Sequence, residues 1–235
     1  MRSILFAVML ASGGLTLSSD PAPTLLTTPA FDQKTGRLIY VEERKQFDEP
    51  GRLGTWRFTY RDAAGETIVR RQVHFEKSTL KPSFRLDDLR NGYAEGAELV
   101  GDKIKVFRGG SAGDPYRERL LTVPEPAVVD AGFNAFVEHH WNALMKGDVL
   151  HVNFVAPSQL DYFKFRVYKA RETTHQRKQA VVLKMDIDHV LLRLFVDAIQ
   201  LTYDKGTKQL LVYDGMSNIY DDQGKPHRVR MEFSY

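Results

Sequence analysis

The segment "HRVRMEFSY" (residues 227–235) decides the fold class, because apolar residues occur in it at every second position. Val229, Met231, Phe233 and Tyr235 alternate with polar residues. Successive side chains of a β-strand point to opposite faces of a sheet, so this pattern predicts a strand with one buried and one solvated face. Strands of this kind are typical of antiparallel sheets.

The same alternation recurs through most of the chain, in residues 56–60, 69–75, 150–154, 163–167 and 181–187. Glycine beside Asp, Asn or Lys separates these runs, as in "DAAGE", "YDKGTK" and "DDQGKP", and such clusters favour short turns. Short turns connect antiparallel neighbours. We therefore expect a mainly β protein with one large curved antiparallel sheet, a half-barrel or open barrel of about ten strands.

Two segments have helical rather than alternating periodicity. In residues 130–148, Asp130 is a suitable N-cap, Gly147 a suitable end, and an apolar stripe repeats at three- and four-residue intervals. This pattern predicts one long helix. Residues 188–199 predict a shorter helix, although the same residues also fit a buried strand. A curved sheet leaves an apolar concave face, and we expect these two helices to cover it.

The N-terminal residues suggest export. Residues 1–19 contain one arginine, an apolar run and then small residues, which is typical of a secretory signal peptide; a buried N-terminal helix is the alternative. We expect a flexible leader at 20–35 and a single β-rich domain at 36–235. The 235-residue chain has no cysteine, so neither disulfides nor an acylated N-terminal cysteine are available to it. The expected location is the periplasm or the exterior of a bacterium.

Charge and hydropathy exclude two further classes of protein. The formal net charge is +3 and the basic residues are scattered, so we expect no nucleic-acid partner. The densest basic segments are "VRRQVH" (69–74) and "THQRKQ" (174–179), and we interpret both as solvated or edge-protecting strand charges. No segment after the first 19 residues is long enough for a transmembrane helix, so the mature protein is not expected to span a membrane.

Three motifs suggest chemistry, but none is specific. The segment "GGSAG" (109–113) matches a hydrolase nucleophile motif at Ser111, yet a second strand-like run follows it where a helix is required, so a hairpin loop is the better interpretation. Asp186 and Asp188 lack a third metal ligand and are better explained as solvated strand charges or a helix cap. Adjacent His139 and His140 diverge by about 100° on a helix and cannot chelate one metal. We expect no catalytic residue, no metal site and no cofactor.

The remaining signal is aromatic and apolar, with 14 Phe, 10 Tyr and 2 Trp. Such residues usually form core, but in barrels and half-barrels the core and a ligand site can share one surface. We therefore expect a non-enzymatic binding protein that holds a lipid or acyl-bearing ligand between sheet and helix. The alternative is a structural or assembly protein of the cell envelope that acts through a protein partner. The candidate ligand-binding residues are Phe133, Phe136, His140, Trp141, Leu144, Phe163 and Phe165.

A signal peptide, a long antiparallel meander and a helical cover together resemble the periplasmic lipoprotein-carrier type of half-barrel. That resemblance implies a curved sheet and a helical lid around an acyl-binding cavity. The segment "LLVYDGMSNIYDDQGKPHRVRMEFSY" (210–235) is similar to the C-terminal part of exported bacterial proteins of unknown function. Neither resemblance includes a functional motif that matches this chain residue by residue, and fold alone does not fix function.

Overall fold

The computed structural model describes residues 24–49, 52–110, 114–189 and 198–235. The expected signal peptide, Ser111 and most of the expected second helix lie outside these ranges. Within them, no helix is long and apolar enough to cross a membrane.

The described strands belong to one 15-stranded sheet, which confirms the mainly β, curved antiparallel fold class but exceeds the expected count of about ten. The strands are β1 Thr24–Asp32, β2 Leu38–Glu49, β3 Arg52–Arg61, β4 Thr67–His74, β5 Ser83–Asp88, β6 Ala94–Val100, β7 Lys103–Gly109, β8 Arg117–Leu121, β9 Ala127–Val129, β10 Leu150–Ala156, β11 Asp161–His175, β12 Lys178–Ile187, β13 Ile199–Asp204, β14 Leu210–Tyr220 and β15 Pro226–Glu232.

The sheet consists of two meanders that join at the first and last strands of the chain. Its order is β8-β7-β6-β5-β4-β3-β2-β1-β15-β14-β13-β12-β11-β10-β9. The described strand pairs are antiparallel, except for β9 and β10, which run parallel. At the join, Ala30 of β1 lies opposite Met231 of β15. Strand β15, which contains most of the alternating residues 227–235, therefore lies near the middle of the sheet, between β1 and β14.

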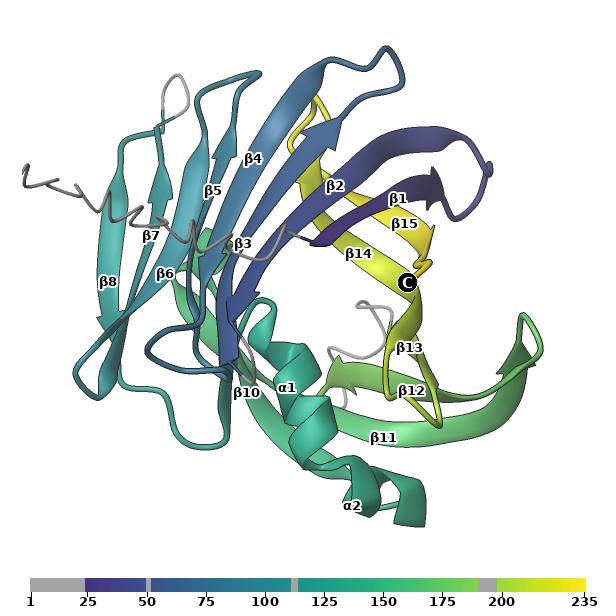
Figure 1. Ribbon diagram of the computed structural model, residues 1–235. Coiled ribbons are helices and arrows are strands. Elements are labelled where there is room, and N and C mark those ends of the chain that lie inside the picture. Colours follow the sequence, from purple (N-terminus) through teal and green to yellow (C-terminus); the bar gives the residue numbers. More distant parts are fainter. Residues whose placement is uncertain (1–23, 50–51, 111–113, 190–197) are drawn as a thin grey trace, which may run out of the picture.

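The sheet curls until its two ends approach one another (Figure 1). The short 3-10 helix η1, Pro157–Gln159, contacts β6 and β7 across the opening. Arg119 of β8 donates to the carbonyl oxygen of Leu160 at 3.2 Å and pairs with the Asp161 carboxylate at 3.2 Å. These contacts are made by side chains and a turn rather than by a strand ladder, so the sheet is an open barrel.

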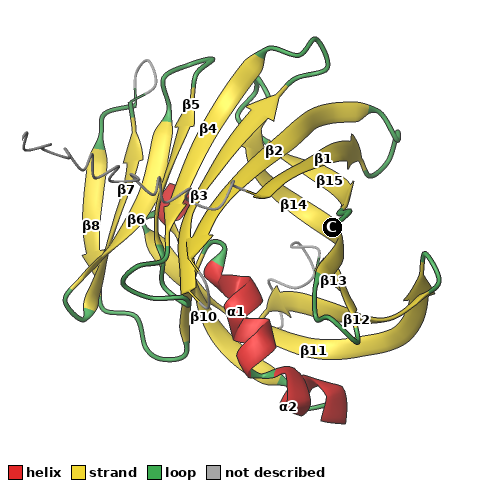
Figure 2. Ribbon diagram, in the orientation of Figure 1, coloured by secondary structure: helices red, strands yellow, loops and turns green. Residues whose placement is uncertain are grey.

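Two short helices stand where one long helix was expected. Helix α1 is Gly132–His139 and helix α2 is Trp141–Lys146. Both lie at the lower end of the curved sheet in Figure 2, where α1 contacts β9 and α2 contacts β11. His140, with φ −101° and ψ 13°, interrupts the helical backbone between them. The turn lets Trp141 meet the ring of Tyr203 on β13, with centroids 6.2 Å apart. Gly147 ends α2 in the left-handed conformation, as expected.

The prediction that Asp130 caps the first helix is wrong. The N-cap residue is Ala131, and no side chain caps this helix. Asp130 itself has a φ of +44°, uncommon for a residue with a side chain, and its carboxylate turns toward Arg71. The Asp130 carboxylate accepts a hydrogen bond from the buried Arg71 guanidinium instead of from the N–H groups of the helix.

The expected flexible leader at residues 20–35 is also different in the structure. Residues 24–32 form β1, which pairs with β2 along its length and with β15 at its C-terminal end. Thr28 and Ala30 are buried, so this segment has the same alternating burial as the other strands. Local sequence pattern could not predict this pairing, because the partner strand β15 lies about 200 positions further along the sequence.

Each half of the sheet has its own apolar core. Residues of β1 to β8, with single residues of β9, β10 and β14 and two of β15, form one cluster around Phe58, Val73 and Val106. Helices α1 and α2 pack with β9 to β13 in a second cluster around Phe136, Leu144 and Leu183. The candidate site lies where these two clusters meet.

Candidate functional site

A cavity of about 400 Å³ lies between the concave face of the sheet and the start of α1. Its lining comes from both halves of the sheet, from η1 and from the last residues of the chain. A volume of this size falls within the range of about 300–1,000 Å³ that small-molecule sites occupy.

One side of the cavity is apolar. It is built by inward-facing residues of β10 to β14 and by the first turn of α1, which all belong to or pack against the second core cluster. These residues are Phe133, Phe154, Phe165, Met185, Ile199, Leu201, Leu210 and Tyr213. The rings of Phe133 and Phe165 each lie beside that of Phe154, with centroids 6.4 and 6.2 Å apart.

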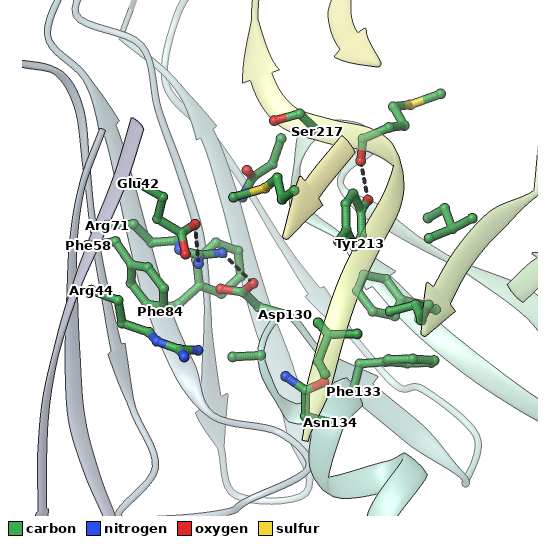
Figure 3. A pocket seen from close by; sticks show the side chains of 18 of the residues that line it. Glu42, Arg44, Phe58, Arg71, Phe84, Asp130, Phe133, Asn134, Tyr213 and Ser217 are labelled. Atoms are coloured by element: carbon green, nitrogen blue, oxygen red, sulfur yellow. Dashed lines mark hydrogen bonds and ion pairs between the residues drawn. The ribbon is translucent and has the colours of Figure 1, made fainter. Parts of the chain in front are cut away.

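The opposite side carries charged residues on the interior face of the sheet. Glu42 and Arg44 of β2 and Arg71 of β4 line the cavity, and Asp130 joins them from the segment before α1 (Figure 3). Glu95 of β6 also belongs to the lining. Their side chains are inside because strand alternation places them there, in phase with buried apolar residues.

The interpretation of "VRRQVH" as a solvated basic segment is therefore wrong for one of its two arginines. Arg70 is exposed, but Arg71 lies between Val69 and Val73 on the inner face. The sequence contained the signal, since a residue two positions from each of two core valines must share their face.

Arg71 is the centre of an ion cluster. Its Nη1 lies 2.8 Å from Oδ1 of Asp130, its Nη2 lies 3.9 Å from Oε2 of Glu42, and its Cζ stands 3.8 Å from the centroid of the Phe58 ring. Burial raises the pKa of Asp130, and the Arg71 charge opposes that rise. The pair links β4 to the start of α1 and so fixes one wall of the cavity.

Arg44 differs from Arg71 in having no acidic partner. The residue is 8% exposed, and its Cζ lies 5.0 Å from the centroid of the Trp56 ring. Its Nε is buried without a hydrogen-bond acceptor, and no described residue forms an ion pair with its guanidinium. Arg71 Nε and Asp130 Oδ2 are likewise buried without a partner among the described residues.

Glu95 adds a carboxyl group that titrates near neutral pH. The residue is 5% exposed, and burial raises its pKa to about 7, partly opposed by a hydrogen bond that the Tyr93 hydroxyl donates to Oε2 at 2.9 Å. The nearby Asp130 charge raises it further, while Arg108 lowers it. At pH 7 this group is therefore divided between its neutral and charged forms.

Hydroxyl groups at the edge of the cavity bind one another. The Tyr40 and Ser217 oxygens are 2.9 Å apart, next to the point where the register of β14 and β15 shifts between Met216 and Tyr220. Burial raises the pKa of Tyr40, so its hydroxyl stays neutral and does not act as a base toward Ser217. This pair is suited to hydrogen bonding rather than to nucleophilic catalysis.

The predicted ligand-binding residues divide into three groups. Phe133 and Phe165 line the cavity. Phe136, Trp141 and Leu144 belong to the second core cluster, and His140 packs its ring on Phe136 with centroids 4.6 Å apart; these four are outside the lining. Phe163 is 36% exposed and also outside it. The tryptophan that lines the cavity is Trp56.

The side chains of the other candidate motifs make structural hydrogen bonds and ion pairs. Arg166 binds the Asp186 carboxylate through Nε and Nη2, both at 2.9 Å, and Asp188 accepts from His151 Nδ1 at 2.9 Å. His139 Nδ1 lies 2.7 Å from the carbonyl oxygen of Ala135. Within the described ranges, no group of three His, Cys, Asp or Glu side chains is placed to hold a metal ion.

The chain matches no protein-family model, and neither the curated proteins nor the solved structures contain a significant match. The geometry of the cavity is therefore the best indication of what the protein does.

Proposed function

We propose that this protein is an exported, non-enzymatic binding protein that holds an apolar or acyl-bearing ligand between the curved sheet and α1. The observation that carries the proposal is the cavity of about 400 Å³, with its continuous wall of aromatic and aliphatic side chains. The signal-like residues 1–19 support export to the periplasm or exterior of a bacterium.

Burial of an alkyl chain supplies the binding energy in this proposal. Each methylene group removed from water contributes about 0.8 kcal/mol, so a twelve-carbon chain contributes close to 10 kcal/mol before ordering costs are subtracted. Phe154, Phe165 and Leu201 would contact the chain along β10, β11 and β13. The ordering cost on the protein side is small, because these side chains already pack in the second core cluster.

A structural or assembly protein of the cell envelope is the second candidate. Edge strand β8 favours it, since Leu120 on this strand is 52% exposed and one side of the strand has no neighbour in the sheet. An exposed apolar side chain on an edge strand is suited to pairing with another chain.

Native mass spectrometry of the protein purified from a bacterial periplasm tests both candidates. We expect an adduct that releases a lipid on extraction. Leu210→Trp, which fills part of the cavity, should reduce the adduct, whereas Leu120→Trp on the outer edge should retain it. An unliganded mass that does not change after incubation with lipids, together with a protein partner lost in a Leu120→Lys variant, would favour the assembly protein instead.

A further inference from the structure

The cavity has two chemically different sides. On one side, charged groups project from β2, β4 and β6 among aromatic rings of β2 to β5; on the other side, the lining of β10 to β13 is aromatic and aliphatic. Figure 3 shows Glu42, Arg44 and Arg71 of the charged side. Asp130 and Phe133 lie between them, at the start of α1. A uniformly apolar ligand would leave the first side unmatched, whereas an amphiphile would complement both.

The acidic and basic residues of the charged side are not evenly paired. Arg71 has Asp130 at 2.8 Å and Glu42 at 3.9 Å, so two carboxylates surround one guanidinium. Arg44 has no carboxylate among the described residues, and its partner is the face of the Trp56 ring. A cation–π contact offsets only part of the cost of burying a cation.

An anionic group in the cavity would supply the missing partner. A guanidinium presents N–H donors in a planar fork that matches a carboxylate or phosphate, and Arg44 is nine-tenths buried at the cavity wall. We propose that the ligand is a single-chain amphiphile with an anionic headgroup, which Arg44 binds, while its alkyl chain lies against Phe154 and Phe165. This inference rests on the proposed function and specifies its ligand class.

A cationic headgroup fits less well. Glu42 and Asp130 both interact with Arg71, and the raised pKa of Glu95, about 7, reduces the negative charge that it contributes at neutral pH. An ammonium group would have to displace Arg71 from its carboxylates or remain near Arg44, and like charges in a buried site are unfavourable.

Isothermal titration calorimetry with four probes tests the inference: decanoate, decyltrimethylammonium, 1-decanol and acetate. Decanoate and decyltrimethylammonium are kept below their critical micelle concentrations, and 1-decanol below its solubility limit. We expect decanoate to bind most tightly, decanol more weakly, and neither decyltrimethylammonium nor acetate at comparable concentrations. Decanol tests whether the headgroup must be charged, and decyltrimethylammonium tests whether the charge must be negative. Acetate tests whether a small anion without an alkyl chain binds equally well.

Two substitutions at Arg44 locate the headgroup. Arg44→Met keeps a long side chain without charge and should weaken decanoate roughly tenfold to a hundredfold, with decanol changed less than about twofold. Arg44→Lys keeps the charge and should weaken decanoate less. The matched control is Arg57→Met on β3, because Arg57 also stacks on an aromatic ring, Phe47 at 4.8 Å, but is exposed on the outer face.

The outcomes separate the inference from the proposed function. If decanol binds as tightly as decanoate, if Arg44→Met weakens both equally, or if the ammonium or acetate equals decanoate, the headgroup inference is wrong while a binding cavity still stands. If no alkyl probe binds the folded wild-type protein, the proposed function fails and the inference fails with it. The comparison among probes uses the wild-type protein, so it holds even if an Arg44 variant does not fold.

Discussion

Substitution of Glu95 by glutamine should make the protein less sensitive to pH. Burial raises the pKa of Glu95 from its usual 4.5 to about 7. Between these two values the folded protein retains a proton that the unfolded chain has released. The contribution of Glu95 to the unfolding free energy of the wild type therefore falls as the pH rises from 4.5 to 7, and this contribution is lost above pH 7.

The expected size of the effect follows from that difference in pKa. At about 1.4 kcal/mol for each pH unit, a rise from 4.5 to about 7 corresponds to roughly 3 kcal/mol. Glutamine does not ionise, and its side-chain oxygen can still accept the hydrogen bond that Tyr93 donates at 2.9 Å. The unfolding free energy of Glu95→Gln, relative to wild type, should therefore increase by about 3 kcal/mol between pH 4.5 and pH 8.

Urea unfolding at pH 4.5, 6 and 8, followed by tryptophan fluorescence, measures this difference. The control is Glu98→Gln on the same strand, whose side chain is 45% exposed and pairs with Lys105 at 3.2 Å. Its effect should stay below about 1 kcal/mol at each of these pH values. Parallel pH profiles for wild type and Glu95→Gln would refute the reasoning, since the carboxyl group would then titrate alike in the folded and unfolded states.

Three further predictions concern the stability of the buried ion pair beside the cavity and of helix α1. Arg71→Met should destabilise the protein by about 3–5 kcal/mol in urea unfolding at pH 7, because Asp130 would lose its buried partner; a smaller loss in an Arg71→Met, Asp130→Asn double variant would identify the pair as the cause. Gly132→Ala should lower the thermal midpoint despite the higher helix propensity of alanine, because its Cβ would lie 2.2 Å from the carbonyl oxygen of Leu80. Phe136→Ala should cost about 3–5 kcal/mol in the same urea assay, since the ring is 1% exposed in the core under α1.

Local periodicity was sufficient to predict strands with regular alternation, such as β3, β4 and β10 to β12, since it depends only on which face each residue takes. The alternation of Val229 and Met231 placed β15 correctly, and the glycine turns gave its antiparallel neighbour β14. Periodicity cannot identify a partner that is distant in sequence. The pairing of β1 with β15 joins residues about 200 positions apart, and it converted an expected flexible leader into a central strand.

The candidate site was harder to predict because its decisive residues are charged. Arg71 was in phase with the buried valines on either side of it, and Arg44 shares a face of β2 with buried Tyr40, but charge normally indicates a solvated face. The helix stripe, in contrast, was correctly recognised as buried, yet only Phe133 of its predicted ligand-binding residues lines the cavity. Position on an apolar face shows that a side chain is buried, and only the tertiary structure shows whether it is packed or borders a space.

The charged side of the cavity is costly for the folded protein. Burial disfavours the charged form of Glu95, Arg44 has no acidic partner, and Asp130 adopts a left-handed backbone conformation. A core serving stability alone would be more stable with apolar residues at these positions, since replacement of buried ionic groups by apolar residues of similar volume is often neutral or stabilising. Arg44→Met should on this argument leave stability unchanged or raise it while it weakens anion binding. Such a trade between stability and binding is characteristic of a ligand site and not of a packed core.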